Sequence, residues 1–194
     1  MKILGSFKRG LAFVVSGPSG AGKTTLVEML CDEFDCVERS LSFTTRAPRS
    51  TEKPGIDYNF ISVAEFEEKI GKGDFLEYAK VFDQYYGTSK SFVEAQKNSG
   101  KHVILVIDTQ GAIQLMGSYD ASFIFISPPS VKELRKRMHS RKSETEATIE
   151  QRLSWAEKEM DLVSRYNYHI INEDLQAAYQ VLRSILIAEE HKIH

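Results

Sequence analysis

Near its start the chain groups three glycines, a lysine and two threonines in a run that could hold a phosphate chain. Glycines at 17, 20 and 22 permit backbone angles that turn successive N–H groups inward around a phosphate. Lys23 adds a compact positive charge for the outer phosphates, and the Thr24 hydroxyl suits a Mg²⁺ ion. The run fits the phosphate-binding loop pattern of glycine, four residues, then Gly-Lys-Ser/Thr. The residues expected to contact the phosphates are Gly17, Pro18, Ser19, Gly20, Ala21, Gly22, Lys23, Thr24 and Thr25.

Such a loop needs a strand before it and a helix after it, and the flanking residues predict both. Residues 11–15 are a β-favouring apolar run, and Leu26, Val27 and Leu30 follow at helical spacing. A helix that begins near Thr24 also points its positive N-terminal end at the phosphates. Nucleotide binding is therefore the first functional prediction, and a merely flexible glycine turn is the alternative.

Length and composition set the wider bounds. The 194 residues are enough for one domain with a substantial core, and a net charge of −2 gives no overall attraction to nucleic acid or anionic membrane. Two cysteines are too few for a metal site or a disulfide framework. The N-terminal apolar run is too short for a signal peptide or a membrane span. We therefore expect a cytoplasmic protein with neither nucleic acid nor membrane as a partner.

Strands and helices alternate along most of the chain, which predicts a parallel sheet covered by helices on both sides. Residues 102–107 and Ser122–Ser127 are near-continuous apolar runs, typical of strands buried on both faces. A strand at Tyr168–Ile171 and a helix from Asp174 close the chain. Residues 37–43 are expected to form one strand, and a long helix is expected to run to about Arg165.

The stretch of about residues 38–97 has a different character, with mixed strands, aromatic residues and two arginines. Ser62 and Glu65 predict a capping box at the start of a helix, and Phe75–Val81 and residues 85–88 predict two strands around a turn. We interpret this stretch as an insertion that binds a second substrate. A charged lid is expected at about 138–152, which leaves a core of about 1–37, 98–137 and 153–194 within a single domain.

A series of motifs, in order along nearly the whole chain, resembles the guanylate kinases. They are GPSGAGKTT from Gly17, SFTTRAPR from Ser42, DYNF from Asp57, FLEYA from Phe75, YYGT from Tyr85, IDTQG from Ile107, and SPPS with ELRKR from Ser127. The resemblance implies an α/β fold, a three-layer P-loop kinase core with a parallel sheet, a mixed α+β GMP-binding insertion and a short lid. It implies transfer of the γ-phosphate of ATP to GMP with Mg²⁺, and leaves the use of dGMP open.

The resemblance also implies which residues bind the acceptor. Arg46 and Arg49, with the hydroxyls of Tyr58 and Tyr86, would clamp the GMP phosphate, and arginine suits this through its bidentate geometry. Glu77 would accept hydrogen bonds from guanine N1–H and the 2-amino group, which adenine cannot offer together. The GMP-binding set is Ser42, Arg46, Arg49, Tyr58, Glu77, Tyr86, Thr88 and Asp108.

Catalysis in such an enzyme is positioning plus charge stabilisation, because the attacking phosphate oxygen is already anionic and needs no general base. The resemblance brings further arginines to the transferring phosphoryl group. The expected catalytic set is Lys23, Arg46, Arg137, Arg141 and Arg152, with Thr24 as the metal ligand. For each arginine the alternative is a solvated surface residue.

Four places in the chain carry open questions. Asp108, at the end of a buried strand, could support Mg²⁺ as in other phosphate-loop enzymes, whereas the resemblance suggests contact with the acceptor. The family usually has a second acid two residues earlier, where this chain has Val106, and its lid is usually richer in glycine than Lys142-Ser143. Asn172 matches a family position near the adenine of ATP, with a simple turn residue as the alternative.

Two other functions remain as alternatives. Domains similar to guanylate kinase in scaffold proteins bind phosphopeptides without chemistry, but they typically have a degraded phosphate loop, whereas Lys23 and Thr24 are present here. A related kinase acting on a different small phosphate-bearing acceptor is the third interpretation. The sequence leaves the choice between a monomer and a homo-oligomer open.

Overall fold

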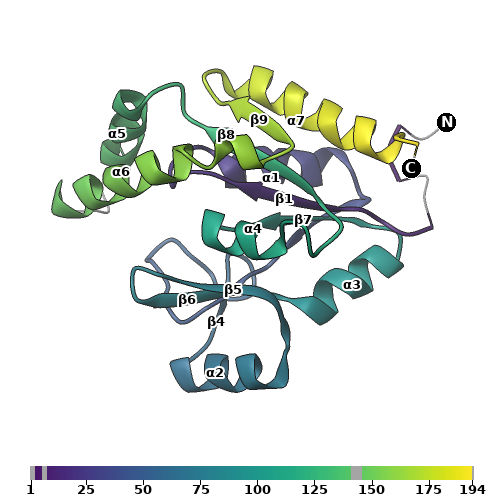
Figure 1. Ribbon diagram of the computed structural model, residues 1–194, viewed down its shortest axis with the longest axis horizontal. Helices are drawn as coiled ribbons and strands as arrows, with labels where there is room; N and C mark the ends of the chain where they lie inside the picture. Colours follow the sequence, from purple (N-terminus) through teal and green to yellow (C-terminus); the bar gives the residue numbers. More distant parts are fainter. Residues whose placement is uncertain (1–2, 6–7, 141–145, 194) are drawn as a thin grey trace.

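The apolar strands expected from the sequence form one parallel sheet at the centre of the molecule (Figure 1). The structure is a computed structural model, and it describes residues 3–5, 8–140 and 146–193. The five-stranded sheet has the order β2-β7-β1-β8-β9, and every pairing in it is parallel. Its strands are β1 (Ala12–Ser16), β2 (Val37–Ser40), β7 (His102–Val106), β8 (Ser122–Ser127) and β9 (Tyr168–Ile171).

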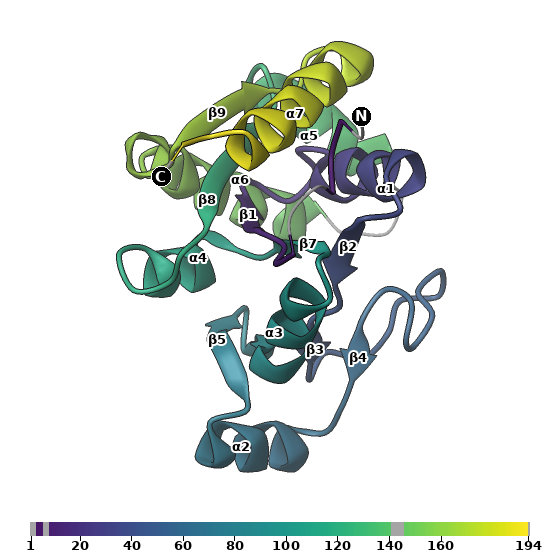
Figure 2. The same ribbon diagram turned by 90° about the vertical axis from the view of Figure 1, so that its right-hand side faces the viewer.

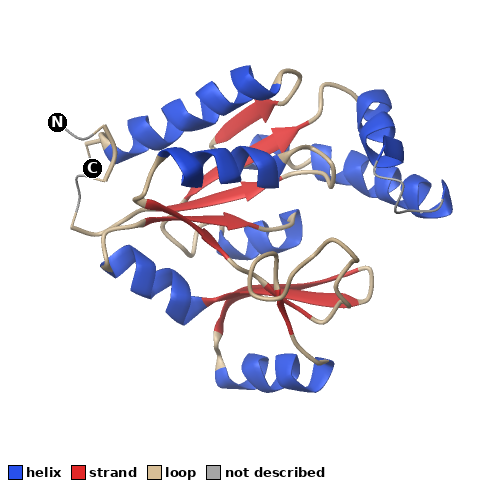
Figure 3. Ribbon diagram, turned by 180° about the vertical axis from the view of Figure 1, so that it is seen from behind, coloured by secondary structure: helices blue, strands red, loops and turns tan. Residues whose placement is uncertain are grey.

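Helices cover both faces of this sheet and make three layers (Figure 3). On one face lie α1 (Lys23–Glu33) and α7 (Leu175–Glu190), which also contact each other. On the other lie α3 (Lys90–Asn98) and α4 (Thr109–Leu115). The predicted three-layer α/β core with a parallel sheet is confirmed.

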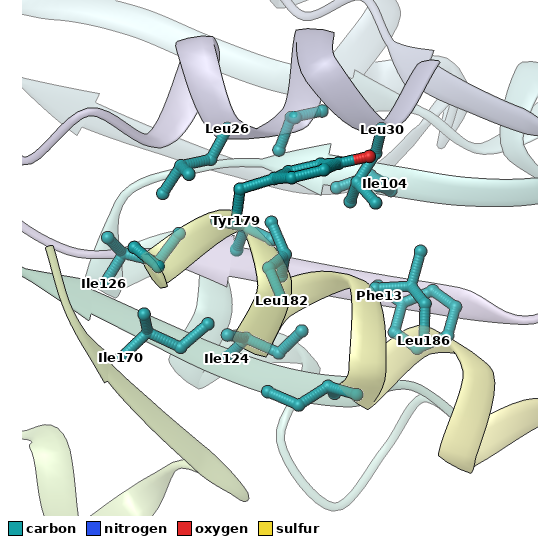
Figure 4. Packing of buried hydrophobic residues seen from close by; sticks show 14 of the residues in the cluster. Phe13, Leu26, Leu30, Ile104, Ile124, Ile126, Ile170, Tyr179, Leu182 and Leu186 are labelled. Atoms are coloured by element: carbon teal, nitrogen blue, oxygen red, sulfur yellow. The ribbon is translucent and has the colours of Figure 1, made fainter. Parts of the chain in front are cut away.

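Strand β1 is buried on both faces, which explains why residues 12–15 are all apolar. Phe13 and Val15 pack into the core beneath α1 and α7, whereas Ala12 and Val14 pack into the core beneath α3 and α4. Successive side chains of a strand point to opposite faces, so a strand covered on both sides has no polar face. Figure 4 shows the first of these cores, where side chains of α7 meet those of the sheet and α1.

A second, four-stranded sheet with the order β4-β3-β6-β5 lies beside the core, below it in Figure 2. Strands β3 and β4 are parallel, and the other pairings are antiparallel. The predicted hairpin is present, with a bulge in β5 between Phe75 and Glu77. The elements of this sheet and its helix are β3 (Phe43–Thr44), β4 (Asn59–Phe60), α2 (Val63–Lys72), β5 (Phe75–Val81) and β6 (Gln84–Ser89).

Helix α2 is fixed to the second sheet by its cap and by one aromatic side chain. Ser62 and Glu65 form the expected capping box, which satisfies backbone N–H groups at the helix start. Phe66 is fully buried and stacks on Phe75 at 4.4 Å and on Tyr85 at 5.0 Å between ring centroids. This aromatic cluster is the main apolar support of the small sheet.

Helices α5 (Val131–Ser140) and α6 (Glu146–Met160) extend from one end of the core and pack on each other. Leu134 and Met138 of α5 meet Ile149, Leu153 and Ala156 of α6 in a separate small core. The segment between these helices, with Arg141, Lys142 and Ser143 of the expected lid, lies outside the described residues. In the described part of the chain, none of the helices has the length and apolarity that crossing a bilayer requires.

Two expected elements are corrected by the structure. Residues 37–43 do not form one strand, because β2 ends at Ser40 and pairs with β7, whereas β3 begins at Phe43 and pairs with β6. A run of strand-favouring residues cannot show that its two halves belong to different sheets. The long helix ends at Met160 instead of about Arg165, and residues Val163–Arg165 form a separate 3₁₀ turn.

Replacing the aromatic anchor of α2 tests this packing. Phe66→Ala should lower the free energy of unfolding by about 3–5 kcal/mol, because a buried ring is lost and a cavity remains. Val63→Ala, at a side chain that is 49% exposed on the same helix, is the control and should change it by less than about 0.5 kcal/mol. Urea denaturation measures both, and equal effects would contradict the assigned role of Phe66.

Candidate active site

A cleft is lined by residues of the core and of the second sheet, among them Gly17 after β1 and Asp108 after β7. It brings together residues that are far apart in the sequence: the phosphate-binding loop, the two insertion arginines, Glu77 and Asp108. The expected site residues that line it are Gly17, Ser19, Gly20, Gly22, Lys23, Thr24, Thr25, Ser42, Arg46, Arg49, Tyr58, Glu77, Tyr86, Asp108 and Arg152.

The backbone of the phosphate-binding loop has the conformation that its glycines were expected to allow. Gly17, Gly20 and Gly22 have φ values of 135°, 94° and 92°, a region that other residues rarely enter. Space is also limited, because a Cβ at Gly17 would lie 2.0 Å from the carbonyl oxygen of Ile126 in β8. A Cβ at Gly22 would lie 2.3 Å from the amide nitrogen of Asn172. Gly17 and Gly22 therefore need to be glycine both because a side chain would clash and because of their backbone conformation.

Lys23, at the start of α1, folds back over this loop. Its Nζ donates hydrogen bonds to the carbonyl oxygens of Gly17 at 2.5 Å and Pro18 at 3.0 Å. The ammonium group is thereby held over the loop, where phosphate oxygens would compete for its protons. The exposed Thr24 follows it in the first turn of the helix.

Asn172 and Arg137 support the loop from behind. The Asn172 side chain is 4% exposed and donates to the carbonyl oxygen of Ala21 at 2.8 Å. Arg137 of α5 in turn donates to the carbonyl oxygen of Asn172 at 2.9 Å. The described contacts of Asn172 thus hold the loop in place, and a contact with adenine stays a prediction.

The expected catalytic arginines lie in different places. Arg152 of α6 reaches the phosphate-binding loop and donates to the Ser19 hydroxyl at 3.0 Å. Arg137 contacts the segment behind that loop. Arg141 lies outside the described residues, so its predicted role has no structural counterpart here.

Across the cleft, Arg46 and Arg49 converge on one carboxylate that the sequence analysis did not single out. Glu52 accepts from Arg46 at 2.9 Å and from the backbone N–H of Arg49 at 2.8 Å, and its carboxylate lies 3.6 Å from the Arg49 guanidinium. The hydrogen bonds from Arg46 and from the Arg49 backbone lower the pKa of Glu52 despite its partial burial. Glu52 therefore orients both arginines towards the same place.

Two tyrosines complete this cationic corner. Arg46 donates from Nε to the Tyr86 hydroxyl at 3.2 Å, and its guanidinium lies 5.5 Å from the centre of the Tyr58 ring. The Tyr58 and Tyr86 rings contact each other edge to face at 6.1 Å. Burial raises the pKa of the Tyr58 hydroxyl, so it remains a hydrogen-bond donor at neutral pH. The residues expected to clamp a phosphate thus lie together, and their role in binding it stays a prediction.

Glu77 is the most unusual group in the cleft. It is 5% exposed, accepts a hydrogen bond from the Thr88 hydroxyl at 2.6 Å, and packs against Gly111 in the first turn of α4. Burial raises the pKa of its carboxyl to about 7, and no lysine, arginine or histidine forms an ion pair with it in the described parts of the chain. A carboxylate in this position has unused capacity to accept hydrogen bonds, and Ser42 lines the same cleft.

Asp108 serves first as a helix cap. Its carboxylate accepts from the backbone N–H groups of Gln110 at 2.7 Å and Gly111 at 3.0 Å, which starts α4. Burial raises the pKa of this carboxyl, and the two N–H donors oppose that shift. The cap explains an aspartate at this position without any ligand, so its contact with acceptor or metal stays a prediction.

Glu159, Trp155 and Phe82 also border the cleft, and sequence reasoning missed them. Burial raises the pKa of Glu159 to about 7, and its carboxylate lies 3.5 Å from the Thr109 hydroxyl. The helical spacing of Trp155 and Glu159 from Arg152 could have identified these two residues from the sequence. Arg152, Trp155 and Glu159 are separated by three and four residues, so they share one face of α6.

Comparison with known proteins agrees with this geometry. A family model described as guanylate kinase matches residues 9–189. The chain belongs to the guanylate kinase family. It is 56% identical over 193 residues to a guanylate kinase of Protochlamydia amoebophila, covering 100% of this chain and 98% of that one. It is 44% identical over 186 residues to a guanylate kinase of Clostridium perfringens, covering 95% and 86% respectively.

Solved structures lead to the same family. The crystal structure of a guanylate kinase from Anaplasma phagocytophilum matches with a TM-score of 0.79 at 34% identity, over 95% of this chain and 88% of that one. The guanylate kinases are ATP:GMP phosphotransferases, so the expected enzyme class, a nucleoside monophosphate kinase, is confirmed. A phosphopeptide-binding module without chemistry is not supported.

The buried carboxyl of Glu77 makes the stability of the free kinase depend on pH. Its pKa of about 7 in the folded state lies above the reference value of 4.5, so the folded protein keeps a proton that the unfolded chain loses between these values. Stability should therefore fall as pH rises through this window. Glu77→Gln removes the effect and should raise the free energy of unfolding by roughly 2–4 kcal/mol at pH 8, but by less than about 1 kcal/mol at pH 5.

Urea denaturation at the two pH values measures the difference, with exposed Glu157→Gln as the matched control. A stabilisation by Glu77→Gln of the same size at pH 5 and pH 8 would show that Glu77 is not the desolvated acid described above.

Proposed function

We propose that the two ends of the cleft bind the two nucleotides of the guanylate kinase reaction, with ATP at the phosphate-binding loop and GMP in the insertion. The proposal is supported by the separation of two cationic groups, Lys23 with Arg152 on the core side and Arg46 with Arg49 on the insertion side. The insertion is assigned to about residues 38–97, the lid to about 138–152 and the core to the remainder.

On the donor side, the loop N–H groups would surround the β- and γ-phosphates of ATP. Lys23 would exchange its bonds to the Gly17 and Pro18 carbonyls for bonds to phosphate oxygens. Arg152, held beside Ser19, can follow the γ-phosphate as it moves. Asn172 and Arg137 keep the loop rigid, so that these N–H groups need no reorganisation on binding.

On the acceptor side, Arg46 and Arg49 would hold the GMP phosphate with the hydroxyls of Tyr58 and Tyr86. Two phosphate charges about 4 Å apart repel by roughly 1 kcal/mol per pair in water, and by more in a drier site. Fixed cations on both sides of the transfer offset this repulsion. The attacking phosphate oxygen is already anionic, so in-line transfer depends on positioning and charge stabilisation.

The residues present fit a magnesium ion that is held mainly by ATP. Among the described residues, no group of three or more His, Cys, Asp or Glu side chains forms a metal cage. Mg²⁺ usually keeps several waters and binds through substrate phosphates with one or two protein oxygens. The Thr24 hydroxyl, next to Lys23 on the cleft wall, is the proposed protein ligand. When bound, the ion would neutralise charge on the phosphate oxygens.

Glu77 would select guanine. Its ionised carboxylate can accept hydrogen bonds from N1–H and the 2-amino group of guanine at once. The Thr88 hydroxyl donates to Oε1 of this carboxylate and fixes its orientation. Adenine has an acceptor at N1 and lacks the 2-amino group, so the buried carboxylate would face it unpaired. This pairing distinguishes GMP from the other small phosphate-bearing acceptors.

An acceptor panel tests the proposal. GMP should exceed AMP, CMP and UMP in kcat/KM by about 10⁴-fold, and Glu77→Gln should lower the value for GMP by roughly 100- to 10,000-fold. Lys23→Ala should abolish turnover, whereas Lys132→Ala, an exposed lysine on α5, should not. ADP release in a coupled assay measures each. Equal use of AMP by the wild-type enzyme would contradict the role of Glu77.

The metal assignment has its own test. Removal of Mg²⁺ with a chelator should stop ADP release, and Thr24→Ala should raise the Mg²⁺ concentration needed for half-maximal rate. Thr24→Ser keeps the hydroxyl and should restore the wild-type dependence on Mg²⁺. An unchanged Mg²⁺ dependence in Thr24→Ala would show that this hydroxyl is not the ligand.

A further inference from the structure

One aromatic contact joins the insertion to α6 across the rim of the cleft. The rings of Phe82, at the β5–β6 turn, and Trp155, in the middle of α6, lie 5.6 Å apart at an angle of 53°. Both residues line the cleft, and both also line a second hollow. In Figure 1 the tip of the hairpin and α6 lie on the same side of the molecule.

The backbone at Phe82 does not follow the usual chemistry of a tight turn. Val81 pairs with Gln84, so Phe82 and Asp83 form a two-residue hairpin loop. Their φ values are 47° and 63°, in the left-handed region that such loops normally fill with Asn and Gly. A bulky residue in this region is an outlier. The Phe82 side chain is also 42% exposed, so neither turn preference nor core burial accounts for it.

The other half of the contact lies on the helix that carries a donor-site arginine. Trp155 is three residues after Arg152 and shares its face of α6, with buried Glu159 one turn further on. Arg152 reaches Ser19 of the phosphate-binding loop from this face. The Trp155 ring and the Arg152 guanidinium are therefore carried by neighbouring positions on one face of α6.

We propose that Phe82 and Trp155 are positioning residues that form a latch between the acceptor-binding insertion and the donor-side helix α6. When the two rings are in contact, the latch fixes the insertion, which binds GMP, relative to Arg152, which lies at the ATP phosphates. This inference rests on the proposed placement of the two nucleotides. Neither ring needs to touch a nucleotide for the latch to act.

We expect loss of the latch to lower kcat/KM for GMP and to leave the binding of GMP alone nearly unchanged. Aromatic pairs of this kind contribute enough to change an equilibrium by about 2- to 12-fold. Phe82→Gly removes the ring and relieves the left-handed turn, so the variant should be at least as resistant to urea as the wild type. Its kcat/KM for GMP at saturating ATP should nevertheless fall by about 2- to 12-fold, whereas the Kd of GMP alone, measured by calorimetry, should change by less than 2-fold.

The matched series is Phe82→Gly, Trp155→Ala, Trp155→Phe and the double variant Phe82→Gly/Trp155→Ala. Trp155→Phe should retain most of the activity. The double variant should be no worse than the poorer single variant, because the two residues act through each other. Val181→Ala, at an exposed apolar residue of α7, is the control and should leave the kinetics unchanged.

Trp155 is the single tryptophan of the chain, so its fluorescence follows the latch directly. In the wild type, addition of GMP with a non-hydrolysable ATP analogue should change its emission. In Phe82→Gly the same addition should produce a much smaller change. A full-size change in Phe82→Gly would contradict the latch.

Two further results would overturn the inference. Losses that multiply in the double variant would show that the two residues act independently. A large rise in the Kd of GMP alone or of the ATP analogue alone in Trp155→Ala would show that the indole contacts a nucleotide. Failure of the proposed function is distinguishable from both, because it would appear as a wild-type enzyme that does not prefer GMP.

Discussion

The site depends on one carboxylate that is kept out of water, and no cationic side chain among the described residues forms an ion pair with it. Glu77 is held by the Thr88 hydroxyl and by the first turn of α4, and burial raises its pKa to about 7. Burying a charge costs free energy unless hydrogen bonds replace those to water. The empty kinase therefore carries a cost in free energy. In the proposed acceptor site the N–H groups of guanine would remove this cost, which would link acceptor recognition to stability at the same carboxylate.

Around this carboxylate the fold separates positive charge into two groups that it holds rigidly. On the insertion side, Glu52 holds Arg46 and Arg49 together, which would orient the proposed clamp before a phosphate binds. On the core side, Asn172 holds the phosphate-binding loop from behind, and the loop backbone fits closely against Ile126. Preorganised groups of this kind need little rearrangement when charge develops in the transition state. The proposed latch of Phe82 and Trp155 would join these two groups across the cleft.

Local patterns predicted most of the fold and the conformation of the phosphate-binding loop. The buried strands, the capping box at Ser62 and the loop ending in Lys23 each depend on neighbours in sequence, and the structure contains them. Features that depend on distant partners were not visible. The split of residues 37–43 between two sheets is one example, because the pattern of strand-favouring residues is the same whichever sheet they join. The acceptor roles came from family resemblance, since a glutamate at 77 taken alone would more often be an outward-facing strand residue.

The most direct test of the account is the titration of the Glu77 carboxyl itself. Side-chain ¹³C NMR on protein labelled at glutamate, with Glu77→Gln to assign the signal, gives its pKa with and without GMP. The account predicts a pKa of about 7 in the free enzyme and a clear decrease when GMP is bound, because the guanine donors favour the ionised form. A pKa near the reference value of 4.5 in the free enzyme, unchanged by GMP, would contradict it.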